Sequence, residues 1–338
     1  MEKEVQQYFN DSILVQAAST YQITFSSLKE LGSFENYVFE GENSKGDKVI
    51  LRLTHSSHRT KDQIESELNW LTYLHKHNAP VCVCLPSNNG NVVETIKAHD
   101  TAFYASLFEK APGGPVKVHD ISFNDKLITK WGETIGCFHR LTINYSRPNS
   151  IAKRPDLVEE YDKQFAPFLP KEQKLQEKVS EVLQAVKALP KTLERYGLIH
   201  SDVHSGNFFY NQLTNKIVVF DFDDCSYHHL ISDIAIPVYY SSWLKHDNQL
   251  DRNNFSHEFL MHFLKGYQLE RSLHLESLKH LPLFLKLRDC ELYGVFHKKW
   301  DIANLNEKQQ NLLDEIYERI MNDQPIVDLN IDQIIQSL

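Results

Sequence analysis

Long apolar segments, a secretion signal and a disulfide framework are all missing from this sequence. Nowhere in the 338 residues is there an uninterrupted apolar run of the roughly 18 residues that a membrane span requires, so we expect no contact with a membrane. Residues 1–10 are polar and lack the apolar core of a signal peptide. The five cysteines are scattered and odd in number, which fits a reducing compartment, and we expect a cytoplasmic protein.

Excess basic charge, repeats and low-complexity tracts are also missing. Lysine and arginine number 36 against 45 aspartate and glutamate residues, giving a net charge of −9, which argues against a nucleic-acid partner. Cys82 and Cys84 have no second pair at a zinc-binding spacing, and their alternation with valines predicts a strand instead. With 41% apolar and 24% charged residues the chain is an ordinary globular one, long enough for two domains or two lobes.

The order of the sequence patterns predicts an α+β fold with a β-rich first part and a helical second part. Short strand-like runs are expected at Tyr37–Glu42, Lys48–Leu53, Cys82–Leu85, Val92–Ile96 and Ala102–Phe108. Helices are expected within residues 1–20 and at Asp62–His77, Asn124–Leu141, Pro170–Tyr196, Phe255–Gln268 and Glu276–Phe296. The Pro- and Gly-rich segment 111–115 separates the two parts. We therefore predict an N-terminal lobe over residues 1–108, a hinge over 109–115 and a C-terminal lobe over 116–338.

Three oxygen-bearing side chains lie close together in the second part of the sequence. Asn207 follows Asp202 by five residues, and Asp221 follows fourteen residues later, directly after the apolar run Ile217–Phe220. Phosphoryl transfer to a hydroxyl needs such a set, because one carboxylate orients the hydroxyl while an amide and a second carboxylate hold Mg²⁺. We therefore predict Asp202 as the catalytic base and Asn207 and Asp221 as metal ligands, with Asp223 a less certain third.

Histidines and a further aspartate surround this set. His200 and His204 flank Asp202, and we interpret them as hydrogen-bond partners that support the loop, since a metal site would need a third close ligand. Asp233 precedes an apolar helix start, where it either caps the helix or reaches back to hold the catalytic loop.

The first part of the chain should supply the grip on the phosphates. Arg52 stands among apolar neighbours in a predicted strand and would be costly to bury unpaired. Glu67 on the following amphipathic helix can reach it, and the pair would present a cation to the α and β phosphates. Gly32 and Ser33 lie in a segment that either covers the phosphates with backbone N–H groups or forms a simple hairpin turn.

These motifs resemble the aminoglycoside phosphotransferase / choline kinase superfamily. Its His-Gly-Asp-x-His-x-x-Asn pattern appears as residues 200–207, and its strand-terminal Asp-Phe as Asp221–Phe222. The spacing in Glu67–Leu71 and the pair Asp223–Asp224 look most similar to the homoserine-kinase-type and stress-response-kinase branch. Ser201 departs from the usual glycine, which requires a backbone conformation that serine can tolerate.

The resemblance implies a bilobal protein-kinase-like fold and an ATP- and Mg-dependent transfer of a phosphoryl group to a hydroxyl of a small molecule. The N-terminal lobe would bind the nucleotide, with Phe108, Glu109 and Lys110 offering backbone groups to the adenine. The helical lobe would bind the acceptor, with Arg288, Asp289 and Tyr293 as candidate lining residues.

Two other functions remain open at this point. A protein kinase of the same superfamily would need a long activation segment, whereas only residues 222–231 separate Asp221 from Ser232. A nucleotide-binding pseudokinase would be expected to lack Asp202, Asn207 or Asp221, and all three are present. The identity of the acceptor, an aminoglycoside, choline, homoserine or similar molecule, and the oligomeric state have no signature in the sequence.

Overall fold

The computed structural model describes residues 3–338, which divide into two compact units. Unit 1 contains the chain up to Pro112 together with Tyr145–Arg154 and Val218–Asp223, and unit 2 contains Gly113–Asn144, Pro155–Ile217 and Asp224–Leu338. The first crossing from one unit to the other falls within the predicted hinge, whose action as a hinge stays a prediction. The sequence patterns gave no sign that two later segments return to unit 1. The α+β prediction is confirmed.

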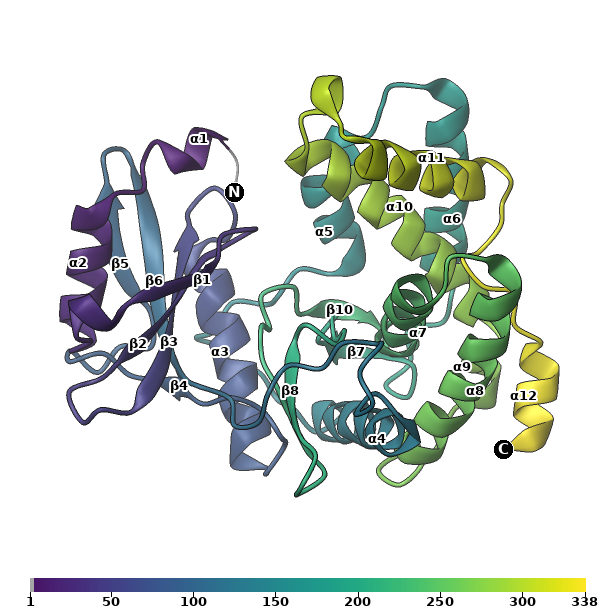
Figure 1. The fold of residues 1–338 in the computed structure, drawn as a ribbon, viewed down its shortest axis with the longest axis horizontal. Helices are drawn as coiled ribbons and strands as arrows, with labels where there is room; N and C mark the ends of the chain where they lie inside the picture. Colours follow the sequence, from purple (N-terminus) through teal and green to yellow (C-terminus); the bar gives the residue numbers. More distant parts are fainter. Residues whose placement is uncertain (1–2) are drawn as a thin grey trace. The chain divides into compact units, whose positions relative to one another are not determined.

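Unit 1 is built on an antiparallel sheet with the strand order β1-β2-β3-β6-β4, on which β5 pairs with β6 (Figure 1). Its strands are Lys29–Gly32 (β1), Tyr37–Glu42 (β2), Lys48–His55 (β3), Cys84–Leu85 (β4), Glu94–Ala98 (β5) and Thr101–Glu109 (β6). Since β3 lies between β2 and β6, Arg52 is placed opposite Val38 on one side and Ser106 on the other. The five predicted strands are all present, with shifted ends.

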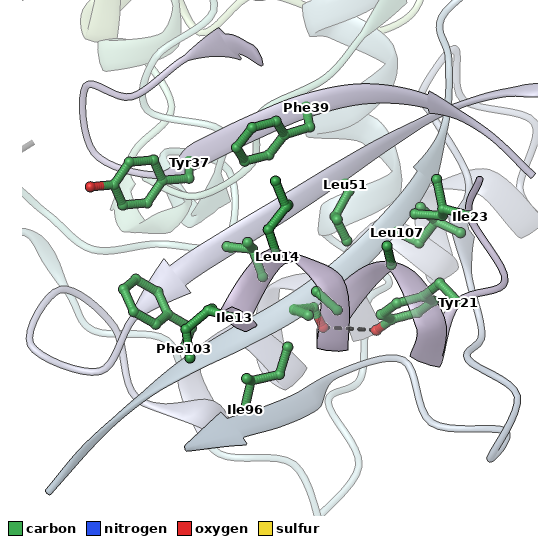
Figure 2. Close-up of a cluster of buried hydrophobic side chains, with 14 of the residues drawn as sticks. Ile13, Leu14, Tyr21, Ile23, Tyr37, Phe39, Leu51, Ile96, Phe103 and Leu107 are labelled. Carbon is green, nitrogen blue, oxygen red and sulfur yellow. Dashed lines mark hydrogen bonds between the residues drawn. The ribbon is translucent and has the colours of Figure 1, made fainter. Parts of the chain in front are cut away.

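One face of this sheet is covered by the N-terminal helices, as Figure 2 shows for α2. The helix predicted within residues 1–20 is two helices, Lys3–Gln6 (α1) and Asp11–Thr20 (α2), and residues 1–2 lie outside the described part. Asn10 separates them because its side chain accepts the N–H groups of Ser12 and Ile13 and so caps α2. Tyr21 donates its hydroxyl to the carbonyl of Ala105 at 2.8 Å, which fixes the end of α2 to β6.

The long helix of unit 1 is Lys61–Lys76 (α3), in agreement with the predicted helix. Thr60 and Gln63 form a capping box at its start. The buried face of α3 includes Trp70, whose ring contacts Phe222 edge-on at 5.4 Å between centroids. This contact holds Phe222, the residue after Asp221, against the helix that carries Glu67.

Unit 2 is mainly helical. Its α-helices are Asp125–Thr142 (α4), Leu157–Gln164 (α5), Gln173–Lys187 (α6), Ser232–Lys245 (α7), Gln249–Tyr267 (α8), Leu275–Leu278 (α9), Leu281–Lys299 (α10), Glu307–Met321 (α11) and Ile331–Ser337 (α12). Short 3-10 helices lie at Phe25–Ser27 (η1) in unit 1 and at Ala166–Phe168 (η2) and Ile302–Asn304 (η3) in unit 2. Among the described residues no helix is both long enough and apolar enough to cross a bilayer.

The remaining strands form two short pairs. Tyr196–Ile199 (β7) pairs with Ser226–His229 (β10), and Phe208–Asn211 (β8) with Lys216–Val219 (β9). The helix predicted to reach Tyr196 is therefore wrong at its end, because this residue begins β7. The strands β7 and β10 were not predicted, since a four-residue strand beside a long helical pattern leaves little periodicity to detect.

Helices α4 and α8 pack closely because glycines face the partner backbone. A Cβ atom added at Gly132 of α4 would lie 1.8 Å from the carbonyl oxygen of Phe263, and one at Gly266 of α8 would lie 1.8 Å from that of Thr129. Trp131, which is fully buried, packs its ring against Phe263 beside this crossing. The close approach fixes the position of α4 and thus of His139, which lies on α4 and contacts Asp233 below the catalytic loop.

Candidate active site

The loop that follows β7 in unit 2 carries Asp202. Its Oδ1 atom accepts a hydrogen bond from Arg288 of α10 at 2.6 Å, and its Oδ2 atom accepts one from the amide of Asn207 at 3.1 Å. The imidazole Nε2 of His204 lies 3.5 Å from the same Oδ2. Both carboxylate oxygens of the predicted base are thus engaged within unit 2.

The surroundings of Asp202 favour its ionised form. Burial by itself would raise the pKa of this carboxyl, but the imidazole of His204 and the guanidinium of Arg288 lower it, so that the pKa lies below its ordinary value. A carboxylate with a lowered pKa is a weak proton acceptor. Such a group can orient a hydroxyl as a hydrogen-bond acceptor, and it receives the proton only when the hydroxyl becomes acidic as the phosphoryl group is transferred.

Asp233 lies in the first turn of α7 and holds the start of this loop. Its two carboxylate oxygens accept the backbone N–H groups of His200 at 3.0 Å and Ser201 at 2.8 Å. His139 of α4 lies 3.3 Å from the same carboxylate and 2.9 Å from the hydroxyl of Tyr267. Of the two readings of Asp233, helix cap or loop support, these contacts favour loop support, because the N-cap residue of α7 is Ile231 and has no capping side chain.

Ser201 adopts the left-handed conformation that its family position requires, with φ of 69°. Serine tolerates it here because its N–H donates to Asp233 and its hydroxyl contacts that of Ser226 at 2.9 Å. His200 is fully buried and its Nδ1 accepts the N–H of Asp202 at 3.3 Å, whereas His204 is half-buried and its Nδ1 accepts the N–H of Gly206. Both histidines therefore contact the loop backbone from within the loop.

Asn207 is oriented by its own amide hydrogens. Its Nδ2 donates to the carbonyl oxygen of Asp202 at 2.8 Å and to the side chain of the same residue at 3.1 Å. With the NH₂ group engaged in this way, the oxygen of the amide is the atom left to bind a cation.

Asp221 and Asp223 belong to unit 1, at the end of β9. Asp221 has a left-handed backbone, with φ of 63°, and its side chain is exposed. Asp221 therefore stays in contact with solvent and does not carry the cost of desolvating a charge. Asp223 does carry it, since only 4% of this residue is exposed.

The Asp223 carboxylate is surrounded by basic groups. Its Oδ2 lies 2.6 Å from Nε2 of His58 and 3.7 Å from Nε of Arg59. Burial alone would raise its pKa, but the charges of His58, Arg59 and Arg52 hold the pKa well below its ordinary value, so the group is an anion. Its other oxygen, Oδ1, is buried and has no hydrogen-bond partner among residues 3–338. A buried, unsatisfied anionic oxygen fits a cation ligand.

No group of three or more His, Cys, Asp and Glu side chains that could enclose a metal occurs among residues 3–338. An oxygen-preferring Mg²⁺ that keeps water and phosphate oxygens as ligands needs only one or two protein carboxylates. Asn207 in unit 2 and Asp221 and Asp223 in unit 1 each carry oxygen donors, the type that such an ion prefers, and none of them is a thiolate or imidazole of the kind found in closed zinc centres.

Arg52 and Glu67 form a two-fold hydrogen-bonded ion pair inside unit 1. The distances are 2.8 Å from Nη1 to Oε1 and 2.7 Å from Nη2 to Oε2, and both side chains are buried. Although burial opposes its charge, the neighbouring carboxylate of Glu67 raises the pKa of Arg52. The guanidinium also lies over the ring of Phe108, 5.2 Å from its centroid. The pairing predicted from spacing is present, and its role toward phosphates stays a prediction.

The other residues predicted to touch the nucleotide lie at the ends of strands β1 and β6. Gly32 ends β1 and is exposed, and Ser33 follows it and is half-buried. The N–H of Glu109 already donates to the carbonyl of Val83 at 2.9 Å, and that of Lys110 to the carbonyl of Lys48 at 3.4 Å. A contact of these two residues with an adenine would therefore use their carbonyl oxygens.

Several residues around Asp202 have no sequence motif. Arg288 was expected only to line the acceptor pocket, and its contact with Asp202 was not predicted. Asp289, its neighbour, is buried and hydrogen-bonded to Arg319 of α11 and Tyr239 of α7. Tyr240 and Glu291, which contact Arg288, were missed. A helix of even polarity such as α10 gives no sign of which polar residue points inward.

Known proteins resemble this chain over its whole length. The model of the phosphotransferase enzyme family matches residues 26–275. The amicoumacin kinase of Bacillus subtilis (strain 168) is 32% identical over 327 residues, which are 96% of each chain. A solved amicoumacin kinase in complex with AMP-PNP, Ca²⁺ and Ami is 33% identical, covers 99% of this chain and 100% of its own, and has a TM-score of 0.93. A microcompartment-associated aminopropanol kinase, at 21% identity and a TM-score of 0.73, shares the fold over 97% of this chain and 98% of its own.

The chain therefore belongs to the phosphotransferase enzyme family. The predicted superfamily and its protein-kinase-like fold are confirmed. The protein is a kinase that transfers a phosphoryl group to a hydroxyl of a small molecule, so a pseudokinase role as the main function is excluded.

Proposed function

We propose that this kinase phosphorylates a hydroxyl of amicoumacin or of a closely similar small molecule, with ATP as donor. The observation that carries this proposal is the full-length match to a solved amicoumacin kinase, at 33% identity and a TM-score of 0.93. The predicted use of ATP and a divalent metal is confirmed by that relative, which binds AMP-PNP and Ca²⁺. Fold alone does not determine an acceptor, so the substrate is the part that needs an experiment.

Asp202 is the proposed catalytic residue. The acceptor oxygen forms a bond to the γ-phosphorus as the bond from this phosphorus to the β,γ-bridging oxygen breaks, and ADP leaves with that oxygen. The hydroxyl proton passes to the Asp202 carboxylate. The support is its engaged carboxylate, whose oxygens are held by Arg288 and Asn207 while the backbone of the loop is held by Asp233.

Asn207, Asp221 and Asp223 are the proposed ligands of Mg²⁺. When bound, the ion neutralises charge on the β and γ phosphates. The unsatisfied Oδ1 of Asp223 and the amide oxygen of Asn207 support this assignment. His200, His204 and Asp233 hold the catalytic loop and are not metal ligands in this proposal.

Arg52 is the proposed contact to the α and β phosphates, and Glu67 fixes its guanidinium. A buried arginine that forms two hydrogen bonds with one carboxylate has a defined orientation, and its remaining N–H groups can donate to a further anion. Gly32 and Ser33 are proposed to lie against the phosphates, and Phe108, Glu109 and Lys110 against the adenine.

The test is a coupled measurement of ADP release by the purified protein with Mg·ATP and amicoumacin, with homoserine, choline and an aminoglycoside as competing acceptors. Mass spectrometry of the product should show one added phosphate group on amicoumacin. Asp202→Asn should reduce kcat by about 10²-fold or more while the affinity for ATP is kept. Turnover of another acceptor in preference to amicoumacin would overturn the substrate assignment, and wild-type turnover by Asp202→Asn would overturn the catalytic one.

A further inference from the structure

The position of Arg288 in α10 places a guanidinium directly on the catalytic carboxylate. Its Nη2 donates to Oδ1 of Asp202 at 2.6 Å. The remaining oxygen of Asp202 contacts Asn207 and His204. With a different donor on each oxygen, the carboxylate has no freedom to rotate about its χ2 angle without losing a charge-assisted hydrogen bond.

Arg288 is itself fixed on three sides. Its Nη1 donates to Oε2 of Glu291, one turn later on α10, at 3.0 Å. Its Nη2 also donates to the hydroxyl of Tyr240 on α7 at 2.8 Å, and its guanidinium lies 5.2 Å from the centroid of the Tyr240 ring. The planar fork of an arginine can serve Asp202 and Glu291 at once, whereas the single ammonium group of a lysine cannot do so with the same geometry.

All members of this cluster belong to unit 2 and come from separate elements: the catalytic loop, α7 and α10. The side chains of Arg288, Asp202 and Glu291 are mostly buried, with exposed fractions of 14%, 17% and 12%. The cluster therefore does not enclose the Asp202 carboxylate completely, and a hydroxyl can still reach it.

We infer that Arg288 is a positioning residue that holds the Asp202 carboxylate in the orientation required to meet the acceptor hydroxyl, with Glu291 and Tyr240 fixing the guanidinium. The inference rests on the proposed role of Asp202. It predicts that removing Arg288 lowers kcat and leaves the binding of Mg·ATP intact, since Arg288 acts on the acceptor side of the reaction. It also predicts that Arg288 has no effect once Asp202 is gone.

The experiment compares Arg288→Ala and Arg288→Lys with wild type in two reactions: phosphorylation of amicoumacin and the slow hydrolysis of Mg·ATP in which water replaces the alcohol. A displacement of a catalytic group by about 1 Å lowers a rate by about 100-fold. We expect a loss of this size in the kcat of Arg288→Ala, while its KM for ATP stays within about threefold of wild type. The kcat of Arg288→Lys should lie between those of wild type and Arg288→Ala. Added guanidinium ion should restore part of the rate of Arg288→Ala.

The matched control is Arg140→Ala, which removes an ion pair of the same kind, Arg140 with Glu270, from the surface of α4 in the same unit. It should leave kcat unchanged, with or without guanidinium. If Arg288→Ala does not fold, as judged by circular dichroism, Arg288→Lys carries the test. A kcat equal to wild type in the folded Arg288 variants, or equal losses in kcat and in ATP affinity, would overturn the inference.

The double variant Asp202→Asn/Arg288→Ala separates this inference from the proposed function. We expect it to be no slower than Asp202→Asn alone, since the two residues act as one unit. If Asp202→Asn keeps wild-type turnover, the proposed catalytic role of Asp202 fails. If Asp202→Asn is inactive and Arg288→Ala turns over like wild type, only the positioning role fails.

Discussion

The carboxylate of Asp233 accepts the backbone N–H of Ser201 at 2.8 Å, at a residue whose φ of 69° is left-handed. The side chain of Asp233, in the first helical turn of α7, thus fixes the backbone next to Asp202. The cost of a left-handed conformation for an L-residue, about 1–2 kcal/mol, is offset by this bond and by the contact between the hydroxyls of Ser201 and Ser226.

Substitutions of Ser201 should follow the conformational cost of the new residue. Ser201→Val places a β-branched residue at positive φ and should lower both the free energy of unfolding, by about 1–2 kcal/mol, and kcat. Ser201→Gly relaxes the backbone but loses the contact with Ser226, so stability should change little. Urea unfolding and steady-state kinetics of both variants provide the measurement, and equal effects of valine and glycine would contradict the prediction.

The Arg52–Glu67 pair should be costly to break and cheap to replace as a whole. Arg52→Met leaves the Glu67 carboxylate buried without its partner and should destabilise unit 1 by about 3–5 kcal/mol. The double variant Arg52→Met/Glu67→Leu should recover most of that loss, since no buried charge remains. Activity should stay low in both, because Arg52 is the proposed phosphate contact. A double variant as unstable as the single one in denaturant would contradict this explanation.

His58 and Asp223 lie 2.6 Å apart, and substitutions of these two residues should change the Mg²⁺ requirement of the enzyme differently. Asp223→Asn removes an anionic oxygen, so the Mg²⁺ concentration for half-maximal rate should rise. His58→Asn breaks the same contact but keeps the carboxylate, so it should lower stability with a smaller change in the Mg²⁺ requirement. Titrations of rate against Mg²⁺ test this, and identical shifts in the two variants would argue against Asp223 as a ligand.

The crossing of α4 and α8 should tolerate no Cβ atom. Gly132→Ala and Gly266→Ala each place a methyl group 1.8 Å from a backbone carbonyl oxygen of the other helix, and each should cost about 3 kcal/mol of unfolding free energy or more. Gly114→Ala is the control, because a Cβ at that position meets no atom within 4 Å. Thermal unfolding should separate the two helix variants from the control by several degrees.

Acid should destabilise the protein through His229, a buried residue of β10. Burial, together with the nearby charges of Lys191 and His280, lowers the pKa of His229 to about 4. In the unfolded chain its pKa is about 6.5, so below that pH the unfolded state binds more protons, and stability is present above pH 6.5 and lost as the pH falls toward 4. The loss from this one group is about 3 kcal/mol.

The measurement is the free energy of unfolding of wild type and His229→Phe between pH 7 and pH 4. The variant carries no titrating group at this position and keeps a ring to contact Tyr196 and Phe284. Its stability should therefore fall less steeply with acid. His75→Gln, at an exposed position of α3, is the control and should follow wild type. Parallel curves for wild type and His229→Phe would refute the prediction.

Local chemistry determined much of what the sequence predicted. The spacing of Asp202, Asn207 and Asp221, the strand around Arg52 and the helix that carries Glu67 depend on neighbours in the chain, and the Arg52–Glu67 pair follows from the cost of burying either charge alone. The short strands β7 and β10 and the division of unit 1 among three chain segments depend on partners distant in sequence, and no local pattern encodes them.

Only the tertiary structure decided which polar side chains meet the base. Arg288 and Asp289 are adjacent on α10, yet Arg288 contacts Asp202 while Asp289 is buried against Arg319. Adjacent helical residues point about 100° apart, and the face each presents is set by the packing of α7, α10 and α11. The sequence by itself thus determined the chemistry of the loop, and packing between distant helices determined the residues that orient it.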